Sequence, residues 1–369
     1  MSKQRLWIVS ELFPPEETST GYIMGEIADT LAEKYDVAVI TGPEVYDPSR
    51  KHTGTAGEPA KPYPVLRCES HTFNKNSLAG KAKSFLATTL SLYKLAKKNI
   101  RRGDKVLMVT NPAPLIVLMS RLKARRHFEL NILVHDVFPE NTRAAGIRLP
   151  LYGVVKSLFD RAYSRADKLI VLGRDMADVM RGKTRGKVSL HIIENWGDFD
   201  NIQPSPMPAS DRIILQYAGN IGRVQGLDSI VATLSDDIDL HFYGSGAMEE
   251  PLRALAKPNV FFHGPYSRSE QSDILAKCHI SLVTLNEKMY GLGTPSKTYN
   301  VLAAGRPVLY FGPDNSEIGL LVKEHHIGFC GWPAEWNADE LREMGRRART
   351  VGERLYSKES ILHKFSEII

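Results

Sequence analysis

The amino-acid sequence predicts an α/β fold made of two doubly wound domains. Short apolar segments alternate with helix-length amphipathic segments along almost the whole chain, which is typical of parallel sheets covered by helices on both faces. A Pro- and Ser-rich stretch without periodicity, DFDNIQPSPMPASD at 198–211, interrupts this alternation. The length of 369 residues also exceeds what one small core holds and indicates about two domains.

Six strand-like segments are expected in each half of the chain. In the first half they span 5–10, 37–41, 105–110, 130–135, 168–172 and 188–193. Helical patterns separate them, among them 21–35 and 77–100, where apolar residues recur at the spacing of one helix face. In the second half the strands are expected at 212–219, 239–244, 259–264, 279–285, 307–312 and 328–332. We therefore place one domain at 1–200 and another at 201–351, joined by the Pro-rich linker.

Composition indicates a globular protein without a membrane-spanning helix. Hydrophobic residues make up 43% and charged residues 24% of the chain, and no apolar run approaches the roughly 18 residues of a spanning helix. MSKQRLWIVS passes directly into a strand, so we expect no signal peptide or N-myristoylation. Cys68, Cys278 and Cys330 form no C-x-x-C pair, which favours a reducing compartment. We expect a cytoplasmic protein, free or peripheral at the inner face of the membrane.

The charge is divided unevenly between the two halves. Residues 1–195 hold 31 Lys and Arg against 20 Asp and Glu, whereas residues 196–369 hold 17 against 22. A basic half joined to an acidic half indicates an anionic ligand or surface for the first half. The alternative is a basic face that only contacts water.

The stretch GLGTPSKTYNVLAAGRPVL, residues 291–309, follows a predicted strand and opens a short helix. Thr294 is a suitable N-cap, Pro295 is the favoured first helical residue, and Gly305 is a C-terminal stop. The helix is therefore expected from Pro295 to Ala304. Ligands of parallel sheets bind at the carboxyl ends of strands, near helix N-termini, and this stretch lies at such an end.

Lys297 is an unfavourable residue for the first turn of that helix, because its ammonium repels the positive end of the helix dipole. Asn300 lies three residues further on and shares its face. An anionic ligand that accepts hydrogen bonds from Lys297, Ser296 and the free backbone N–H groups would reverse this balance. The alternative is a lysine that turns to solvent and binds nothing.

YAGNIGRVQGLD, residues 217–228, is a second candidate anion loop. Its three glycines let backbone amides approach an anion closely, and the planar guanidinium of Arg223 suits phosphate oxygens. FYGSGAMEE, residues 242–250, also joins a strand to a helix through glycines, but G-x-G alone commonly serves close packing. No G-x-G-x-x-G follows the first strand, which counts against a dinucleotide dehydrogenase.

LVHDVFPENTRAAG, residues 133–146, places His135 and Asp136 at the carboxyl end of a strand. Such a pair can hydrogen-bond a sugar hydroxyl or an acceptor nucleophile. The alternative is a helix cap by Asp136 beside a packed His135.

No pattern in the chain indicates a metal site. The D-x-D strings at 198–200 and 237–239 read as turn residues, and EHHIG at 324–328 lacks the i, i+4 spacing of a helical zinc site. We therefore expect neither a metal ion nor a cofactor.

The helix expected over 77–102 combines apolar residues with many cations and could lie on an anionic lipid surface. RLKARRH at 121–127 adds further positive charge. A core-packed helix with a wet basic face is the alternative. The cations of the helix are Lys81, Lys83, Lys94, Lys97, Lys98, Arg101 and Arg102.

Together these motifs resemble GT-B fold glycosyltransferases of family 4, of the kind that builds capsular, O-antigen or colanic-acid-type polysaccharides. GNIGRVQGLD and TPSKTYNVLAAGRPV carry the resemblance, and SELFPPE, HDVFPEN, IIENW and FFHGPYSRSE support it over the whole chain. It implies two Rossmann-like domains facing a cleft, with a final helix at about 352–369 that crosses back onto the first domain. It also implies a retaining, metal-independent enzyme.

The resemblance implies that the second domain binds a nucleotide-diphosphate sugar, UDP-linked in most members, and that the first binds the acceptor. The acceptor would be a glycan or a polyprenyl-diphosphate-linked glycan, and no nucleic acid is expected. The implied catalytic residues are His135, Asp136, Arg223 and Lys297. The implied donor-binding residues are Gly21, Gly219, Asn220, Gly222, Arg223, Gly244, Gly264, Tyr266, Thr294, Ser296, Lys297 and Asn300.

Within this set, Gly222, Arg223 and Lys297 would hold the diphosphate. Tyr266 would meet the base and Asn300 the ribose, while Gly21 and His135 would approach the donor sugar and the acceptor.

The chain departs from the family pattern at several of these positions. The family's E-x7-E motif would place carboxylates at Leu292 and Asn300. The family's usual arginine and lysine in the diphosphate loop align with Asn220 and Gln225, which leaves Arg223 as the expected cation. Two other functions remain open: a nucleotide-sugar 2-epimerase of the same fold, which converts donor without acceptor, and a non-catalytic protein that binds a membrane surface.

Overall fold

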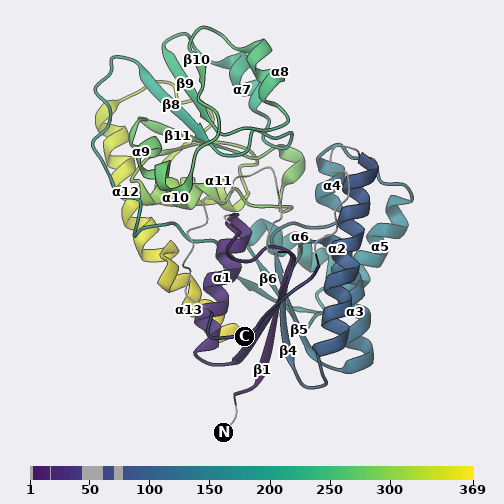
Figure 1. The fold of residues 1–369 in the computed structure, drawn as a ribbon. Helices are drawn as coiled ribbons and strands as arrows, with labels where there is room; N and C mark the ends of the chain where they lie inside the picture. Colours follow the sequence, from purple (N-terminus) through teal and green to yellow (C-terminus); the bar gives the residue numbers. More distant parts are fainter. Residues whose placement is uncertain (1–2, 17, 44–60, 70–77) are drawn as a thin grey trace.

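The computed structural model describes residues 3–16, 18–43, 61–69 and 78–369. The side chains of residues 78–82, Lys81 among them, lie outside this description. Two parallel sheets, one in each half of the chain, are covered by helices (Figure 1). The expected two-domain α/β fold is therefore confirmed.

Within the described residues, the first sheet has seven parallel strands in the order β3-β2-β1-β4-β5-β6-β7. β1 is the third strand in this order and pairs with β2 and β4, and its last five residues are buried. The expected strands are all present, whereas the sequence pattern missed β3, which has only three residues. The strands are β1 (Arg5–Ser10), β2 (Asp36–Thr41), β3 (Val65–Arg67), β4 (Lys105–Val109), β5 (Glu129–Val134), β6 (Lys168–Val171) and β7 (Ser189–Ile192).

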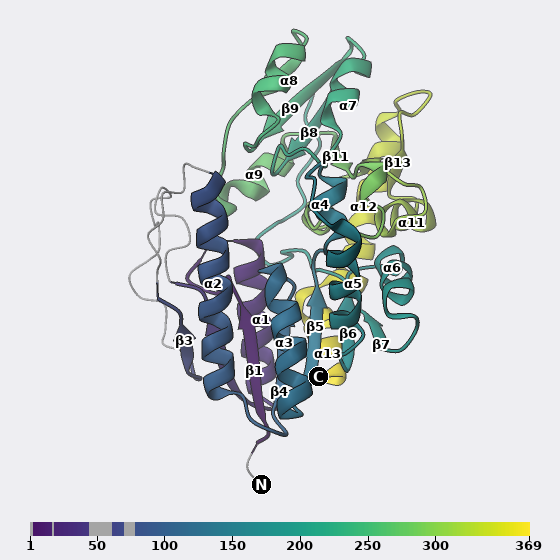
Figure 2. The same cartoon turned by 90° about the vertical axis from the view of Figure 1, so that its right-hand side faces the viewer.

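The helices of the first domain lie on both faces of this sheet. On one face α2, α3 and α5 run side by side, with α3 packed between the other two (Figure 2). On the other face α1 packs against α13, the last helix of the chain. The helices are α1 (Ser19–Ala32), α2 (Leu78–Asn99), α3 (Ala113–Arg126), α4 (Glu140–Ala144), α5 (Tyr152–Tyr163) and α6 (Arg174–Thr184).

The second sheet, again within the described residues, has six parallel strands in the order β10-β9-β8-β11-β12-β13. All six match the expected segments. They are β8 (Ile213–Ala218), β9 (Ile238–Tyr243), β10 (Val260–Phe262), β11 (Ile280–Thr284), β12 (Val308–Phe311) and β13 (Gly328–Cys330). The helices around it are α7 (Leu227–Thr233), α8 (Glu249–Leu255), α9 (Gln271–Ala276), α10 (Lys297–Ala303), α11 (Glu317–His325) and α12 (Ala338–Tyr356), with short 3₁₀ turns η1 (Arg268–Glu270) and η2 (Glu287–Met289).

The C-terminal segment joins the two domains, as expected. α12 packs on α10 and α11 of the second domain. The chain then breaks at Ser357, whose hydroxyl accepts from the Ser360 N–H and caps α13 (Lys358–Ile368). α13 packs on α1 of the first domain. None of the helices in the described part of the chain is both long and apolar enough to cross a bilayer.

Candidate functional site

A cavity of about 610 Å³ lies between the carboxyl ends of the two sheets. The first domain contributes the start of α1, residues 135–136 after β5, and residues 195–196 before the linker. The second domain contributes the end of β8 and residues 293–297 before α10. This volume and this position are those of a small-molecule site in an α/β protein. We call this cavity the cleft.

Lys297 places a buried cation in the cleft. Among the described residues, its Nζ has no hydrogen-bond partner, and it lies 3.3 Å from the centroid of the Tyr217 ring. Burial lowers the pKa of Lys297 well below that of a free lysine, because the charged form loses its hydration. A cation–π contact replaces only part of that hydration. The amine is therefore ready to take an anionic partner.

Gly219 makes room for this amine. It follows β8 with φ +142°, and a Cβ built on it would lie 3.1 Å from the Lys297 Nζ. The Tyr217 hydroxyl donates to the Asn220 carbonyl at 2.7 Å, which holds the ring under the amine. The glycine loop predicted to approach an anion thus lies against the predicted cation.

Unpartnered polar atoms gather in the cleft. Native proteins pair the great majority of buried polar groups, yet five cleft-lining side chains of the described residues hold a buried atom without a hydrogen-bond partner. The group mixes hydroxyls, an imidazole nitrogen, an amide oxygen and an amine, which suits a ligand with phosphate and hydroxyl groups. These residues are His135, Gln225, Thr284, Thr294 and Lys297.

His135 and Asp136 both line the cleft, as expected. Their backbone N–H groups each donate to Thr110 Oγ1 at 3.2 Å, which fixes the loop after β5. Burial lowers the pKa of His135 to about 4, so the ring is neutral near pH 7. Burial also raises the pKa of Asp136, and a hydrogen bond from Asn141 opposes this shift. The helix cap considered as an alternative for Asp136 does not form, because α4 begins at Glu140.

Arg268 supplies a second cation, to which the sequence analysis assigned no role although it lies in the FFHGPYSRSE motif. It lines the cleft from η1 of the second domain. Its guanidinium carbon lies 3.7 Å from the centroid of the Tyr22 ring in α1, and it forms a 3.2 Å ion pair with Asp198 in the linker. Arg268 therefore bridges the two domains at the edge of the cleft.

Arg223, expected to be the cation of the diphosphate loop, does not line the cleft. Its side chain is exposed, while Asn220, Val224 and Gln225 of the same loop face the cavity. The Asn286 N–H donates to the Val224 carbonyl at 3.0 Å, which turns the loop so that Arg223 points to solvent.

The four remaining predicted glycines lie outside the cavity wall, and three of them act through close packing. A Cβ on Gly244 would lie 2.0 Å from the Gly219 carbonyl oxygen, and the Gly244 N–H donates to the Gly264 carbonyl at 2.7 Å. A Cβ on Gly222 would lie 2.7 Å from the Asn220 and Gln225 side chains, and one on Gly21 would lie 2.8 Å from the Glu16 carbonyl oxygen. None of the four glycines lines the cleft. Gly21, Gly222 and Gly244 let neighbouring groups approach closely, whereas a Cβ on Gly264 would meet nothing within 4 Å and that glycine instead adopts φ +79°.

The helix expected from Pro295 to Ala304, at the predicted donor site, begins later than predicted. α10 starts at Lys297, with Ser296 at the N-cap making no side-chain capping bond. Thr294 was expected to cap this helix, but its Oγ1 is unpartnered and faces the cleft. Ser296 and Tyr266 line the cleft as expected, and so does Asn220. Gly305 ends the helix with φ +61°, also as expected.

Asn300 lies at the cleft but both ends of its amide are occupied. Its Oδ1 accepts from the Asp198 N–H at 2.9 Å, and its Nδ2 donates to Gln271 Oε1 at 3.0 Å. Leu292, the other position of the missing carboxylate pair, accepts a backbone hydrogen bond from Val137 at 3.0 Å. These two positions therefore join the second domain to the linker and to the first domain.

Several cleft residues had no signal in the sequence. Tyr217 and Thr284 are ordinary strand residues, and only their position at a carboxyl edge could have marked them. Thr18 accepts from the Gly21 N–H as the cap of α1 and lines the cleft too. Over the described residues, no three His, Cys, Asp or Glu side chains gather into a group that could hold a metal ion.

The sequence and the fold match those of known sugar-transferring enzymes. No protein-family model matches the chain. The chain is 32% identical to the probable glycosyltransferase WbjE of Pseudomonas aeruginosa, over 99% of this chain and 97% of that protein. Its fold matches the sucrose-phosphate synthase of Thermosynechococcus elongatus with a TM-score of 0.76, at 13% identity, over 99% and 98% of the two chains. The chain belongs to the GT-B glycosyltransferases.

Two further comparisons concern relatives of this glycosyltransferase. It is 23% identical to the putative colanic acid biosynthesis glycosyl transferase WcaI of Escherichia coli, over 96% of both chains. Its fold also matches HepE of Anabaena, solved in complex with UDP and glucose, with a TM-score of 0.66 at 11% identity over 99% and 98% of the two chains.

Proposed function

We propose that this glycosyltransferase moves a sugar from a UDP-sugar onto a glycan acceptor carried on polyprenyl diphosphate, in bacterial surface-polysaccharide synthesis. The transfer proceeds with retention of anomeric configuration and without a metal ion or cofactor. The buried, unpartnered amine of Lys297 in the cleft carries the proposal, because a diphosphate is the partner that such an amine lacks. The name of WcaI and the UDP complex of HepE support the polysaccharide and the nucleotide.

The proposed chemistry follows from the charges in the cleft. Breaking the anomeric C–O bond leaves negative charge on the β-phosphate and positive charge on the sugar ring. Lys297 and Arg268 are the cations aimed at the cavity, and they stabilise the departing phosphate more in the transition state than in the ground state. An ion contact at ~4 Å contributes on the order of 4 kcal/mol before desolvation, and ~2.7 kcal/mol is a hundredfold in rate.

The acceptor side of the reaction uses the first domain. The acceptor hydroxyl attacks the anomeric carbon from the face that the leaving phosphate occupies, and its proton passes to a phosphate oxygen as the C–O bond breaks. His135, neutral near pH 7 because burial lowers its pKa to about 4, can accept a hydrogen bond from a sugar hydroxyl through its unpartnered Nε2. Asp136 lies beside it and orients the acceptor.

The test is thermal stabilisation by a panel of nucleotides and nucleotide sugars, with wild type and Lys297→Met. A donor at 100 times its Kd adds about 2.7 kcal/mol to the stability of the wild type. Lys297→Met raises the stability of the free protein by about 1–3 kcal/mol, because it removes a buried polar group without a partner. The same variant loses donor stabilisation and at least tenfold of the transfer rate.

Lys288→Met is the matched control, because Lys288 is exposed in the same domain and lies outside the cleft. Donor stabilisation that is equal in Lys297→Met and wild type contradicts the site. The anomeric configuration of the product, measured by NMR, tests retention. Conversion of the donor sugar in the absence of acceptor would indicate the 2-epimerase instead.

A further inference from the structure

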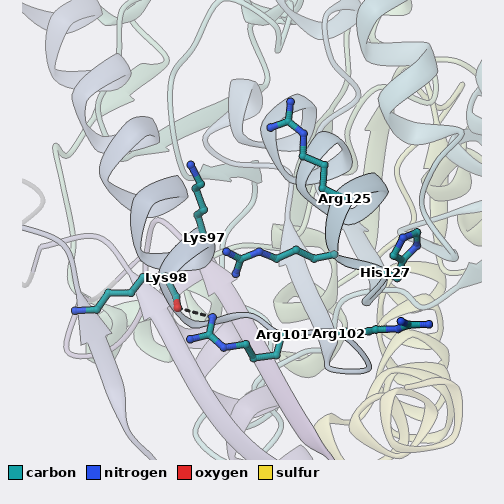
Figure 3. A pocket seen from close by; sticks show the side chains of 7 residues that line it. Lys97, Lys98, Arg101, Arg102, Arg125 and His127 are labelled. Carbon is teal, nitrogen blue, oxygen red and sulfur yellow. Dashed lines mark hydrogen bonds between the residues drawn. The ribbon is translucent and has the colours of Figure 1, made fainter.

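A cluster of cations lies at the end of the first domain away from the cleft. α2 and α3 both run from the cleft side of the sheet to its opposite edge (Figure 2). Their C-terminal ends, with the loops that follow, line a shallow pocket whose every residue is basic or histidine (Figure 3). The pocket residues are Lys97, Lys98, Arg101, Arg102, Arg125, Arg126 and His127.

The cations of this pocket lack carboxylate partners. Within the described residues, none of the seven forms an ion pair, although ion pairs are common elsewhere in the chain. Arg101 and Arg126 instead donate to the backbone carbonyls of Lys98 and Ile100, at 2.5 and 2.7 Å. Bonds to carbonyl groups hold the guanidinium groups in place without neutralising them, and the Asp104 carboxylate accepts from the Arg101 backbone N–H at 2.7 Å rather than from its side chain.

The helix dipole does not account for all of these cations. Lysine and arginine are favourable in the last turn of a helix, and the effect falls off within that turn. Lys83 and Lys94 of α2 lie further from the C-terminus, and neither α2 nor α3 contains an Asp or Glu. The positive charge therefore extends along α2 beyond its last turn, whereas the cations of α3 lie in its C-terminal half.

One face of α2 combines these cations with exposed aliphatic side chains. At about 100° per residue, Lys83, Leu86, Leu90, Lys94 and Lys97 fall on one side of the helix, and all five are exposed. Leu86 is 54% and Leu90 is 51% exposed. An alternation of leucine and lysine without carboxylates suits the boundary between lipid headgroups and acyl chains.

The opposite side of α2 accounts for its packing. Thr89, Leu92 and Ala96 are buried against the first domain, so the exposed leucines are not needed for the core. A soluble nucleic acid would find phosphate partners in the basic pocket but no use for Leu86 and Leu90. A bilayer offers lipid phosphates to the basic pocket and an apolar environment to the two leucines.

We propose that the outer face of α2, together with the basic pocket at the ends of α2 and α3, docks this glycosyltransferase on an anionic phospholipid bilayer. Lipid phosphates occupy the pocket, while Leu86 and Leu90 enter the headgroup boundary. Because α2 extends toward the cleft (Figure 2), this docking holds the cleft near a lipid-linked acceptor. This docking builds on the proposed function, because it brings the enzyme to its lipid-linked acceptor, but it does not depend on the chemistry of sugar transfer.

The experiment is sedimentation with vesicles of phosphatidylcholine containing 30% phosphatidylglycerol, and with pure phosphatidylcholine, at two salt concentrations. (The vesicle composition is about that of a moderately anionic membrane.) Wild type binds the anionic vesicles and is released by salt. The triple variant Lys97→Gln, Lys98→Gln, Arg125→Gln binds about tenfold or more weakly, and Leu86→Ser with Leu90→Ser binds about tenfold more weakly.

Two control variants distinguish a specific role of the pocket residues from a general loss of positive charge, and thermal midpoints exclude a loss of folding. Arg185→Gln, Lys187→Gln, Lys277→Gln removes the same charge from exposed sites elsewhere and keeps vesicle binding. Lys97→Arg, Lys98→Arg, Arg125→Lys keeps the pocket charge and also keeps binding. Thermal midpoints equal to wild type show that each variant is folded.

Any of three results overturns the proposal. The wild type does not bind anionic vesicles, or the pocket triple variant binds them as tightly as wild type, or the leucine variant binds them as tightly as wild type. Pyrophosphate tests whether the pocket binds a free anion instead of lipid phosphate. If it does, pyrophosphate releases the protein from vesicles when sodium chloride of equal ionic strength does not. The vesicle assay contains neither donor nor acceptor. Its failure therefore leaves the proposed transfer reaction untouched, and failure of transfer leaves docking untouched.

Discussion

Lys297 shows how one residue can be marked both by its sequence and by its surroundings. In the sequence it is a cation in the first turn of a helix, where the dipole disfavours it. In the structure it is a buried amine over the Tyr217 ring, without a hydrogen-bond partner among the described residues. Both facts indicate that Lys297 lowers the stability of the protein without a ligand. A bound anion offsets that cost, which is the physical reason to expect tight diphosphate binding.

His135 should make the stability of the protein depend on pH. Its pKa falls from about 6.5 in the unfolded chain to about 4 in the folded chain. Between these values the unfolded state binds a proton that the folded state does not, so stability is lost as the pH falls from 6.5 to 4. The loss attributable to His135 is about 2–3 kcal/mol.

Urea unfolding at pH 7 and pH 4 measures this loss, and His135→Gln removes it. His363→Gln, on an exposed histidine of α13, leaves the loss in place. An identical pH dependence in wild type and His135→Gln would show that the ring does not titrate with unfolding.

At the scale of elements, the cleft depends on how closely the turns after β8 and β9 approach each other. Gly219 adopts a positive φ, lies against Gly244, and leaves space for the Lys297 amine. The strands themselves are typical of the doubly wound fold. Their connecting turns decide which atoms reach the cavity.

Gly219→Ala tests this arrangement. The added Cβ would lie 3.1 Å from the Lys297 Nζ and would occupy a backbone conformation that favours glycine. We expect a stability loss of about 1–2 kcal/mol and at least a tenfold increase in the donor Kd, measured by calorimetry.

Gly331→Ala is the matched control for that substitution. Gly331 also has a positive φ, of +82°, and its Cβ would meet nothing within 4 Å. It should lose a similar amount of stability while donor affinity stays within about twofold of wild type. Equal affinities in the two variants would mean that the turn after β8 does not contact the donor.

At the scale of the whole molecule, contacts that cross between the domains fix the two sides of the cleft relative to each other. Arg268 of the second domain stacks on Tyr22 of the first. The Val137 N–H of the first domain donates to the Leu292 carbonyl of the second at 3.0 Å. Leu292, one of the two positions where the resemblance implied a carboxylate, thus helps to hold the domains together.

Arg268 and Arg223 give a direct test of which arginine serves the donor. Arg268→Ala should lower kcat/KM by at least tenfold, because it removes a cation from the cleft and an interdomain contact. Arg223→Ala should change kcat/KM by less than about threefold, because its side chain is exposed outside the cleft. The reverse order of effects would restore Arg223 as the diphosphate cation and would contradict the loop geometry.

Local sequence signals were enough to predict the strands, their order along the chain and the stretches that form the cleft. Strand and helix periodicity is set by neighbouring residues, so it survives without tertiary information. The short strand β3 was not predicted, because three residues are too few to show the periodicity of a strand. The start of α10 was placed two residues early, because Thr294 has the chemistry of a cap but faces the cleft instead.

By itself, the sequence determined the doubly wound fold, the linker and the basic character of the first domain, and it singled out Lys297 as a candidate anion-binding residue. Only the tertiary structure decided which side chains of the loops enter the cleft. Arg223 turns away because a backbone bond from Asn286 fixes its loop, and Arg268 enters because Tyr22 of the other domain receives it. In an irregular loop, side-chain direction follows from backbone dihedral angles that distant segments impose, and no local pattern records them.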